Sequence, residues 1–303
     1  MSKNFTDVSV DPSVKVIEEW INFPEGEEYY TRTWKAVSDK PIATVVFIHG
    51  FGEHIKRYNH VFDKFGKNNI EVFAYDQRSF GETAVKYNNH GSSGGWKVIE
   101  ADITHALTSQ RREGIPQFLM GHSMGGGFTL RYACEGDERH NLAGYISCSP
   151  WIRLSHYTMP ILQGVGVSFL PIVTKLFPHN ITDGTMIVSN MNPEYISRDP
   201  AQVEKYKKDA LISSKVSILT LGNLKDSENS ILKNNYKKMS FPMYIAHGSD
   251  DKVTEINASK RFLAKIKSAN LMFREWEGRY HELHNDYGNT EVIQSYIQWI
   301  FEQ

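Results

Sequence analysis

The sequence is poor in cysteine and has no long uninterrupted apolar run. Its only cysteines are Cys134 and Cys148, which excludes a disulfide scaffold or a thiolate metal site and favours a reducing compartment. The most apolar long window, residues 161–177, is interrupted by glycine, proline and lysine and is shorter than the roughly 20 residues that span a bilayer. Residues 1–20 hold no apolar run behind a basic stretch, so we predict no secretory signal and expect an intracellular protein.

An excess of charge of one sign is also missing. Lys and Arg total 34 and Asp and Glu total 35, so the net charge is −1. The chain therefore lacks the excess of positive charge that would attract it to nucleic acid, and we expect no nucleic-acid partner. Internal repeats, low-complexity tracts and Pro/Gly/Ser-rich linkers are absent from the sequence as well. We therefore predict one domain over residues 1–303 rather than a chain of modules.

Short β-branched and aromatic runs alternate with helix-like segments along the chain. Residues 96–109, for example, carry an apolar side chain every three or four positions, which is typical of one buried helix face. The alternation predicts an α/β fold with a mostly parallel central sheet flanked by helices. Its expected strands cover residues 44–48, 71–75, 117–120, 144–148, 243–246 and 271–276.

The two ends and the middle of the chain depart from this rhythm. Residues 15–23 and 29–35 are expected to pair as antiparallel strands at the sheet edge, and residues 291–301 to form a final helix. From about 151 to 240 the alternation stops over a stretch too long for a simple crossover. We predict that this segment is an inserted helical cap, or lid, packed over the sheet.

The segment Gly121-His-Ser-Met-Gly125 matches the G-x-S-x-G nucleophile elbow, and it lies between an expected strand and an expected helix. The elbow is a sharp turn, so a Cβ at either glycine would clash with neighbouring backbone. Ser123 is the predicted nucleophile. The alternative is a glycine-rich turn whose serine only caps a helix.

A serine nucleophile needs a base and an acid. In proteins that carry this elbow, the three residues follow along the chain in the order Ser, acid, His. Asp250 and Asp251 come after the expected strand at 243–246, and spacing leaves both open as the acid. His281 follows the last expected strand and is the predicted base, with His284 as its competitor. The segment 281–284 lacks the H-E-x-x-H spacing, so we predict no metal and no cofactor.

Acyl transfer also needs hydrogen-bond donors for the oxyanion, each worth about 3 to 4 kcal/mol in the transition state. His49-Gly-Phe-Gly-Glu-His54 follows the expected strand at 44–48, where such enzymes place one backbone donor. The predicted pair is therefore the backbone N–H of Phe51 and that of Met124. An ordinary strand-to-loop turn is the alternative for this segment.

Together these motifs resemble the monoacylglycerol lipases, serine enzymes of the α/β-hydrolase fold. The matching segments occur in family order and span nearly the whole chain: residues 49–54, 121–126, 248–251 and 277–281. Asp76-Gln-Arg78 and the glycines at 125–127 are most similar to the fungal branch. The resemblance implies that Asp251 is the acid, and it supports His281 as base and Phe51 with Met124 as oxyanion donors.

The resemblance also implies how a substrate is bound. Glu53, Arg57, Tyr206 and His284 match the polar pocket around the glycerol hydroxyls, although plain solvent exposure is the alternative for Arg57 and Tyr206. Segment 151–240 corresponds to the family's cap, whose apolar residues 161–177 would line an acyl tunnel. Through this cap the protein is expected to contact membranes or lipid droplets transiently, as a peripheral protein of the cytoplasm.

The implied activity is hydrolysis of monoacylglycerol to fatty acid and glycerol through an acyl-Ser123 intermediate. A second hypothesis keeps the chemistry but changes the substrate, to lysophospholipids, short-chain esters or fatty acid ethyl esters. A third is a non-catalytic lipid-binding protein on the same fold. Oligomeric state and acyl-chain preference do not follow from the sequence.

Overall fold

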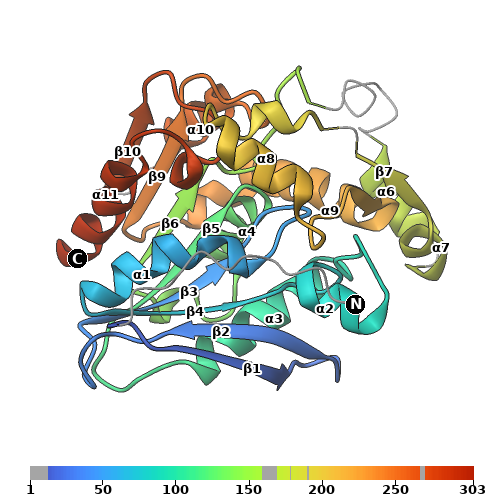
Figure 1. The fold of residues 1–303 in the computed structure, drawn as a ribbon. Coiled ribbons are helices and arrows are strands. Elements are labelled where there is room, and N and C mark those ends of the chain that lie inside the picture. The colour runs from blue at the N-terminus through green and yellow to red at the C-terminus, as the bar shows by residue number, and fades with distance from the viewer. Residues whose placement is uncertain (1–12, 159–168, 178, 190, 267–269) are drawn as a thin grey trace.

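The computed structural model describes residues 13–158, 169–177, 179–189, 191–266 and 270–303. Within these ranges eight strands form one sheet, in the order β1-β2-β4-β3-β5-β6-β9-β10 (Figure 1). The strands of this sheet are β1 (Val16–Asn22), β2 (Glu28–Trp34), β3 (Ala43–Ile48), β4 (Ile70–Tyr75), β5 (Gln117–His122), β6 (Gly144–Cys148), β9 (Met243–Gly248) and β10 (Leu271–Trp276).

The strands from β3 to β10 in this sheet run parallel to their neighbours. Strands β1 and β2 are antiparallel, as are β2 and β4. Along β3, Val45 and Phe47 join one hydrophobic cluster while Val46 and Ile48 join the other. Both faces of the strand are therefore buried, which explains its continuous apolar sequence. The predicted parallel sheet with an antiparallel edge pair is confirmed.

Helices cover both faces of the sheet (Figure 1). Phe62 and Ile293 belong to the hydrophobic cluster on one face, and Ile103, Phe128 and Phe262 belong to the cluster on the other. The first face is covered by α1 (Asn59–Lys67) and α11 (Asn289–Phe301), the second by α3 (Trp96–Ser109), α4 (Met124–Glu135) and α10 (Ile256–Leu263). The short helix α2 (Gly81–Tyr87) follows the loop after β4. The expected helix at 96–109 forms with those bounds.

The segment between β6 and β9 lies over the carboxyl ends of the parallel strands (Figure 1). Its helix α9 packs against α4 of the core and against α6. The segment's elements are α6 (Leu170–Leu176), α7 (His179–Gly184), β7 (Met186–Val188), α8 (Pro200–Lys208), β8 (Lys215–Ser217) and α9 (Ile218–Asn229), with β7 and β8 paired antiparallel. Of the apolar stretch expected at 161–177, residues 161–168 lie outside the described residues. No helix in the described ranges is long and apolar enough to cross a membrane.

Candidate active site

Ser123 stands in a sharp turn between β5 and α4. Its backbone φ is 53°, in the left-handed region that L-residues other than glycine rarely adopt. A Cβ on Gly121 would lie 2.3 Å from the carbonyl oxygen of Gly125, and one on Gly125 would lie 2.1 Å from that of Ile48. Both flanking positions therefore have room only for glycine. The turn lifts the Ser123 hydroxyl to the carboxyl edge of the sheet.

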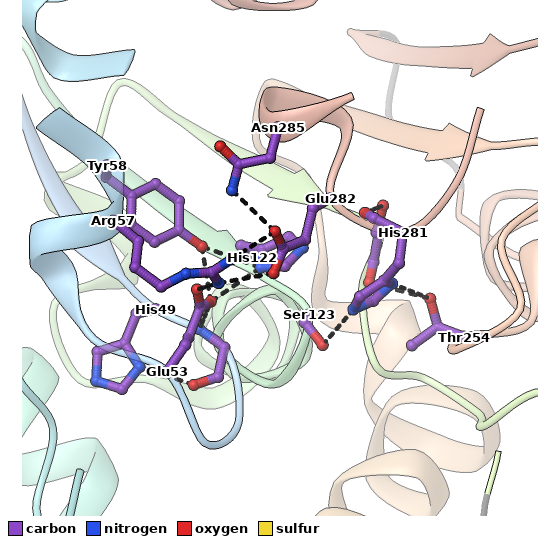
Figure 2. Close-up of polar contacts among 12 residues, drawn as sticks. His49, Glu53, Arg57, Tyr58, His122, Ser123, Thr254, His281, Glu282 and Asn285 are labelled. Carbon is purple, nitrogen blue, oxygen red and sulfur yellow. Dashed lines mark hydrogen bonds and ion pairs between the residues drawn. The ribbon is translucent and has the colours of Figure 1, made fainter. Parts of the chain in front are cut away.

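The Ser123 hydroxyl meets an imidazole and a carboxylate. Its Oγ lies 2.9 Å from Nε2 of His281, and Nδ1 of the same ring lies 2.8 Å from Oδ2 of Asp251. Figure 2 shows the bond between Ser123 and His281. The His281 carbonyl accepts a 2.8 Å hydrogen bond from Ser149, which fixes the loop. Asp250 is instead exposed to solvent. The structure thus brings Ser123, His281 and Asp251 together and leaves Asp250 out.

The Asp251 carboxylate is buried and fully hydrogen-bonded. It accepts hydrogen bonds from the backbone of Val253 and Thr254, from the Thr254 hydroxyl at 2.8 Å, and lies 3.2 Å from Nε2 of His247. Burial acts to raise the pKa of Asp251, but the charge of His281 and the hydrogen bonds from His247 and His281 outweigh it and hold the pKa well below its ordinary value. Asp251 is therefore ionised at neutral pH and can stabilise a charged imidazole.

The candidate oxyanion donors lie in the two turns beside Ser123. Met124 is the first residue of α4, so its backbone N–H has no acceptor inside the helix. Phe51 lies in the turn after β3 and lines the same pocket as Ser123. The preceding Gly50 donates its N–H to Oε1 of Glu53 at 2.5 Å, which holds this turn in shape.

A pocket opens onto Ser123. It lies between the loops of the core and the segment over them, and one side is apolar while the other carries carboxylates and a phenol. Its lining residues are Gly50, Phe51, Glu53, His122, Ser123, Trp151, Leu154, Thr158, Ser189, Met191, Ile196, Tyr206, Val253, His281 and Glu282. This lining suits a ligand that has both an apolar part and a polar part.

Glu53, Arg57 and Glu282 form a buried ion-pair network at the polar side (Figure 2). Nη1 of Arg57 lies 2.7 Å from Glu53 and 2.7 Å from Glu282, and Nη2 lies 2.8 Å from the second oxygen of Glu282. The ring of Tyr206 covers the guanidinium at 5.0 Å. Of the predicted headgroup residues, Glu53 and Tyr206 thus line the pocket, and Arg57 lies buried behind them instead of in solvent.

His284 is not brought to the pocket wall. A short 3-10 turn at Leu283–Asn285 directs its ring inward, where it stacks on Tyr58 with ring centroids 4.6 Å apart. Its centroid lies 4.8 Å from that of His122, which itself lines the pocket. Burial holds the pKa of His284 well below its ordinary value, so the ring is neutral. His284 therefore lies behind His122, and its role at a headgroup stays a prediction.

Two parts of the site were missed by the sequence reasoning. His247 and Thr254 bind the Asp251 carboxylate, but nothing in their local sequence marks them for that contact. Glu282 is the second carboxylate of the pocket, and its only sequence signal is its position directly after His281. Among the described residues no cluster of three or more His, Cys, Asp or Glu is arranged to hold a metal ion.

A strained serine after a parallel strand, bonded to a histidine that is bonded to a buried aspartate, defines a serine hydrolase of the α/β-hydrolase fold. A match to a family model assigns the chain to a family within this class. This chain belongs to the family described as serine aminopeptidase S33, whose model matches residues 39–288.

Fungal lipases are among its similar relatives. A Schizosaccharomyces pombe protein provisionally named a monoglyceride lipase is 34% identical over 91% of this chain and 71% of its own length. The Saccharomyces cerevisiae monoglyceride lipase is 29% identical over 84% of this chain and 83% of its own. The crystal structure of a soluble variant of that yeast enzyme, with a substrate analog, matches the fold with a TM-score of 0.81 over 97% of both chains at 24% identity. The predicted resemblance to monoacylglycerol lipases is confirmed.

Proposed function

We propose that this carboxylic ester hydrolase cleaves monoacylglycerol to a free fatty acid and glycerol. The observation that carries the proposal is one pocket that joins Ser123 to an apolar wall and to a hydrogen-bonding end. The relatives named monoglyceride lipases, at 34% and 29% identity, support the same substrate.

Ser123, His281 and Asp251 are the proposed catalytic residues. His281 takes the proton of Ser123 as Oγ attacks the ester carbon, and the oxyanion accepts hydrogen bonds from the N–H groups of Phe51 and Met124. The ester C–O bond then breaks, and His281 gives its proton to the leaving glycerol oxygen. In the second half, His281 removes a proton from water as the water oxygen attacks the acyl carbon. The bond between that carbon and Oγ of Ser123 then breaks, His281 returns the proton to Oγ, and the fatty acid leaves. Asp251 stabilises the charged imidazole in both halves.

The two sides of the pocket divide the substrate between them. Apolar side chains of Trp151, Leu154 and Val253 face the space beside Ser123 and would hold the acyl chain. The carboxylate of Glu53 and the hydroxyl of Tyr206 would accept hydrogen bonds from the glycerol hydroxyls. Arg57 supports both from behind, and His284 supports them through His122.

The first test is fatty acid release from 1-monooleoylglycerol by the purified protein. Ser123→Ala should lower kcat by about 10⁴- to 10⁶-fold with the fold intact. Ser38→Ala, at an exposed loop serine, is the matched control and should keep wild-type turnover. Turnover of lysophosphatidylcholine without turnover of the monoglyceride would keep the serine chemistry and reject the glycerol headgroup. No Ser123-dependent turnover of either would favour a non-catalytic lipid-binding protein.

We also propose that segment 151–240 acts as a cap that contacts a membrane or lipid-droplet surface. Its elements α6, α7 and β7 lie together at one end of the molecule (Figure 1). They and the residues next to them expose a set of large apolar side chains, of which Leu176 is 74% exposed: Phe169, Ile172, Leu176, Phe177, Ile181, Met186, Ile187 and Val188. Exposed apolar clusters of this kind are typical of surfaces that contact lipid or protein.

Sedimentation with phosphatidylcholine vesicles tests the cap surface. Leu176→Glu places a charge on the most exposed of these side chains and should lower the vesicle-bound fraction. Phe301→Glu makes the same kind of change at an exposed aromatic residue near the end of α11, outside segment 151–240, and should bind as the wild type does. Equal loss in both variants, or in neither, would contradict the proposed surface.

A further inference from the structure

The only guanidinium at the polar end of the pocket, among the described residues, already has carboxylate partners. Both terminal nitrogens of Arg57 donate to carboxylates, Nη1 to Glu53 and Glu282 and Nη2 to Glu282 alone. The ring of Tyr206 covers the guanidinium plane at 5.0 Å. No lysine or arginine occurs among the described residues that line the pocket. An anionic headgroup entering here would find no cation free to bind it.

Glu282 is held rigidly in this arrangement. Its side chain is 4% exposed, and its Oε2 accepts a 2.8 Å hydrogen bond from Nδ2 of Asn285 as well as the one from Arg57. Its backbone N–H donates to the carbonyl of Ile196, in the segment over the core, at 2.7 Å. Figure 2 shows the carboxylate between Arg57 and Asn285, on the side of Ser123 away from Thr254. If the carboxylate rotated away from Arg57, it would lose its hydrogen bonds to Arg57 and Asn285.

Two carboxylates share one guanidinium in this network. Burial acts to raise the pKa of Glu53, but the hydrogen bond and charge of His122 and the charge of Arg57 outweigh it, so the pKa is held well below its ordinary value. The neighbouring His284 is neutral because burial lowers its pKa. Glu53 and Glu282 thus place two carboxylates beside one guanidinium, and His122 contacts Glu53 alone of the two.

We propose that Glu282 is a specificity-determining residue that makes this pocket select uncharged polyol esters and reject single-chain lipids with a phosphate near the ester. Hydroxyl groups donate hydrogen bonds to carboxylate oxygens, whereas a phosphate next to the ester would face Glu53 and Glu282 at close range. Glu282 acts in two ways: it adds the second negative charge, and it occupies Arg57. The inference rests on the proposed function, because it concerns the choice among esters at the same site.

The test compares two substrates that differ only in the phosphate, 1-oleoylglycerol and 1-oleoyl-lysophosphatidate. The wild type should favour the uncharged ester in kcat/KM by about 100-fold or more. Glu282→Gln keeps the side-chain shape, removes the charge and leaves Arg57 only partly neutralised. In this variant kcat/KM for lysophosphatidate should rise by about tenfold, while kcat/KM for 1-oleoylglycerol should fall. The ratio of the two values, which measures the preference for the uncharged ester, should therefore decrease. A purely structural role would lower both values together.

Glu113→Gln is the charge-matched control. Glu113 is exposed and precedes β5, at the end of the sheet opposite Ser123, so the substrate preference should stay at the wild-type value. The inference is overturned if Glu282→Gln keeps the wild-type ratio of kcat/KM for the two esters. It is also overturned if the wild type cleaves both esters equally well, and this second result is measured on the wild-type protein alone. Failure of the wild type to cleave 1-oleoylglycerol while it cleaves other esters would instead reject the proposed function.

Discussion

The serine end and the headgroup end of the pocket are built in different ways. Ser123, Asp251 and His281 each follow the carboxyl end of a parallel strand, so the sheet itself sets their separations. At the headgroup end, Arg57 comes from a short 3-10 turn and Tyr206 from α8 in the segment over the core. Ion pairs, hydrogen bonds and ring contacts between side chains from different segments hold that end together. Backbone topology specifies the first end, and side-chain packing specifies the second.

The two ends should therefore respond differently to mutation. At the serine end a change of one atom removes a proton-transfer partner while the strands stay in place, so activity should fall more than stability. At the headgroup end removing one charge leaves its partners buried and unpaired, so stability should fall as well. Three experiments test this contrast.

The largest effect is expected at the acid of the serine end. Asp251→Asn should lower kcat by about 10⁴-fold, because a neutral amide neither stabilises a charged imidazole nor holds its tautomer. Asp250→Asn, one residue away and exposed, should stay within about twofold of the wild type because surface charges contribute little. Steady-state kinetics on 1-monooleoylglycerol measures both. A larger loss in the Asp250 variant would move the acid to that residue.

An intermediate effect is expected at Arg57. Arg57→Ala leaves Glu53 and Glu282 buried without their counter-charge and should lower the free energy of unfolding by about 3 to 5 kcal/mol. Arg261→Ala breaks an exposed pair with Glu255 and should cost about 1 kcal/mol or less. Urea unfolding monitored by circular dichroism compares the two variants. Equal losses of unfolding free energy in the two variants would mean that the buried headgroup network stabilises the fold no more than an exposed ion pair does.

The smallest effect is the pH dependence of the headgroup end. The pKa of Glu53 is held well below its ordinary value of 4.5 in the folded protein, so its ionised form stabilises the fold above about pH 4.5, and that contribution is lost as pH falls toward the folded-state pKa. Glu53→Gln lacks this contribution. The wild type should thus be the more stable protein at pH 7, with the gap narrowing below pH 4.5 in urea titrations. A gap that widens in acid would reverse the sign of the assigned pKa shift.

Most of the core could be predicted from the sequence because its elements are marked by local patterns. The buried strands have continuous apolar runs, and α3 has its apolar face at helical spacing over Trp96–Ser109. The segment over the core was harder to predict in detail. Its strands β7 and β8 are three residues each, which is too short for a period-two pattern to emerge.

In the candidate site, too, some residues could be identified from local sequence patterns and others could not. Spacing identified Ser123 and His281, because each follows a recognisable strand, but it left Asp250 and Asp251 open until the family resemblance favoured Asp251. The structure separates the two by burial: one carboxylate contacts His281, and the other is in solvent. His284 differs, because the family resemblance implied a headgroup contact for it, whereas a short turn directs its ring inward.

The sequence by itself determined the order of strands and helices, the glycine-flanked turn that strains Ser123, and the succession of serine, acid and histidine. These depend on interactions between residues close in the chain or on the fixed geometry of a parallel sheet. Only the tertiary structure decided which carboxylate is buried against His281, how Arg57 is shared between Glu53 and Glu282, and which side of the pocket is polar. Those features arise where segments far apart in the chain bury charge against one another, and burial is set by packing that no local pattern records.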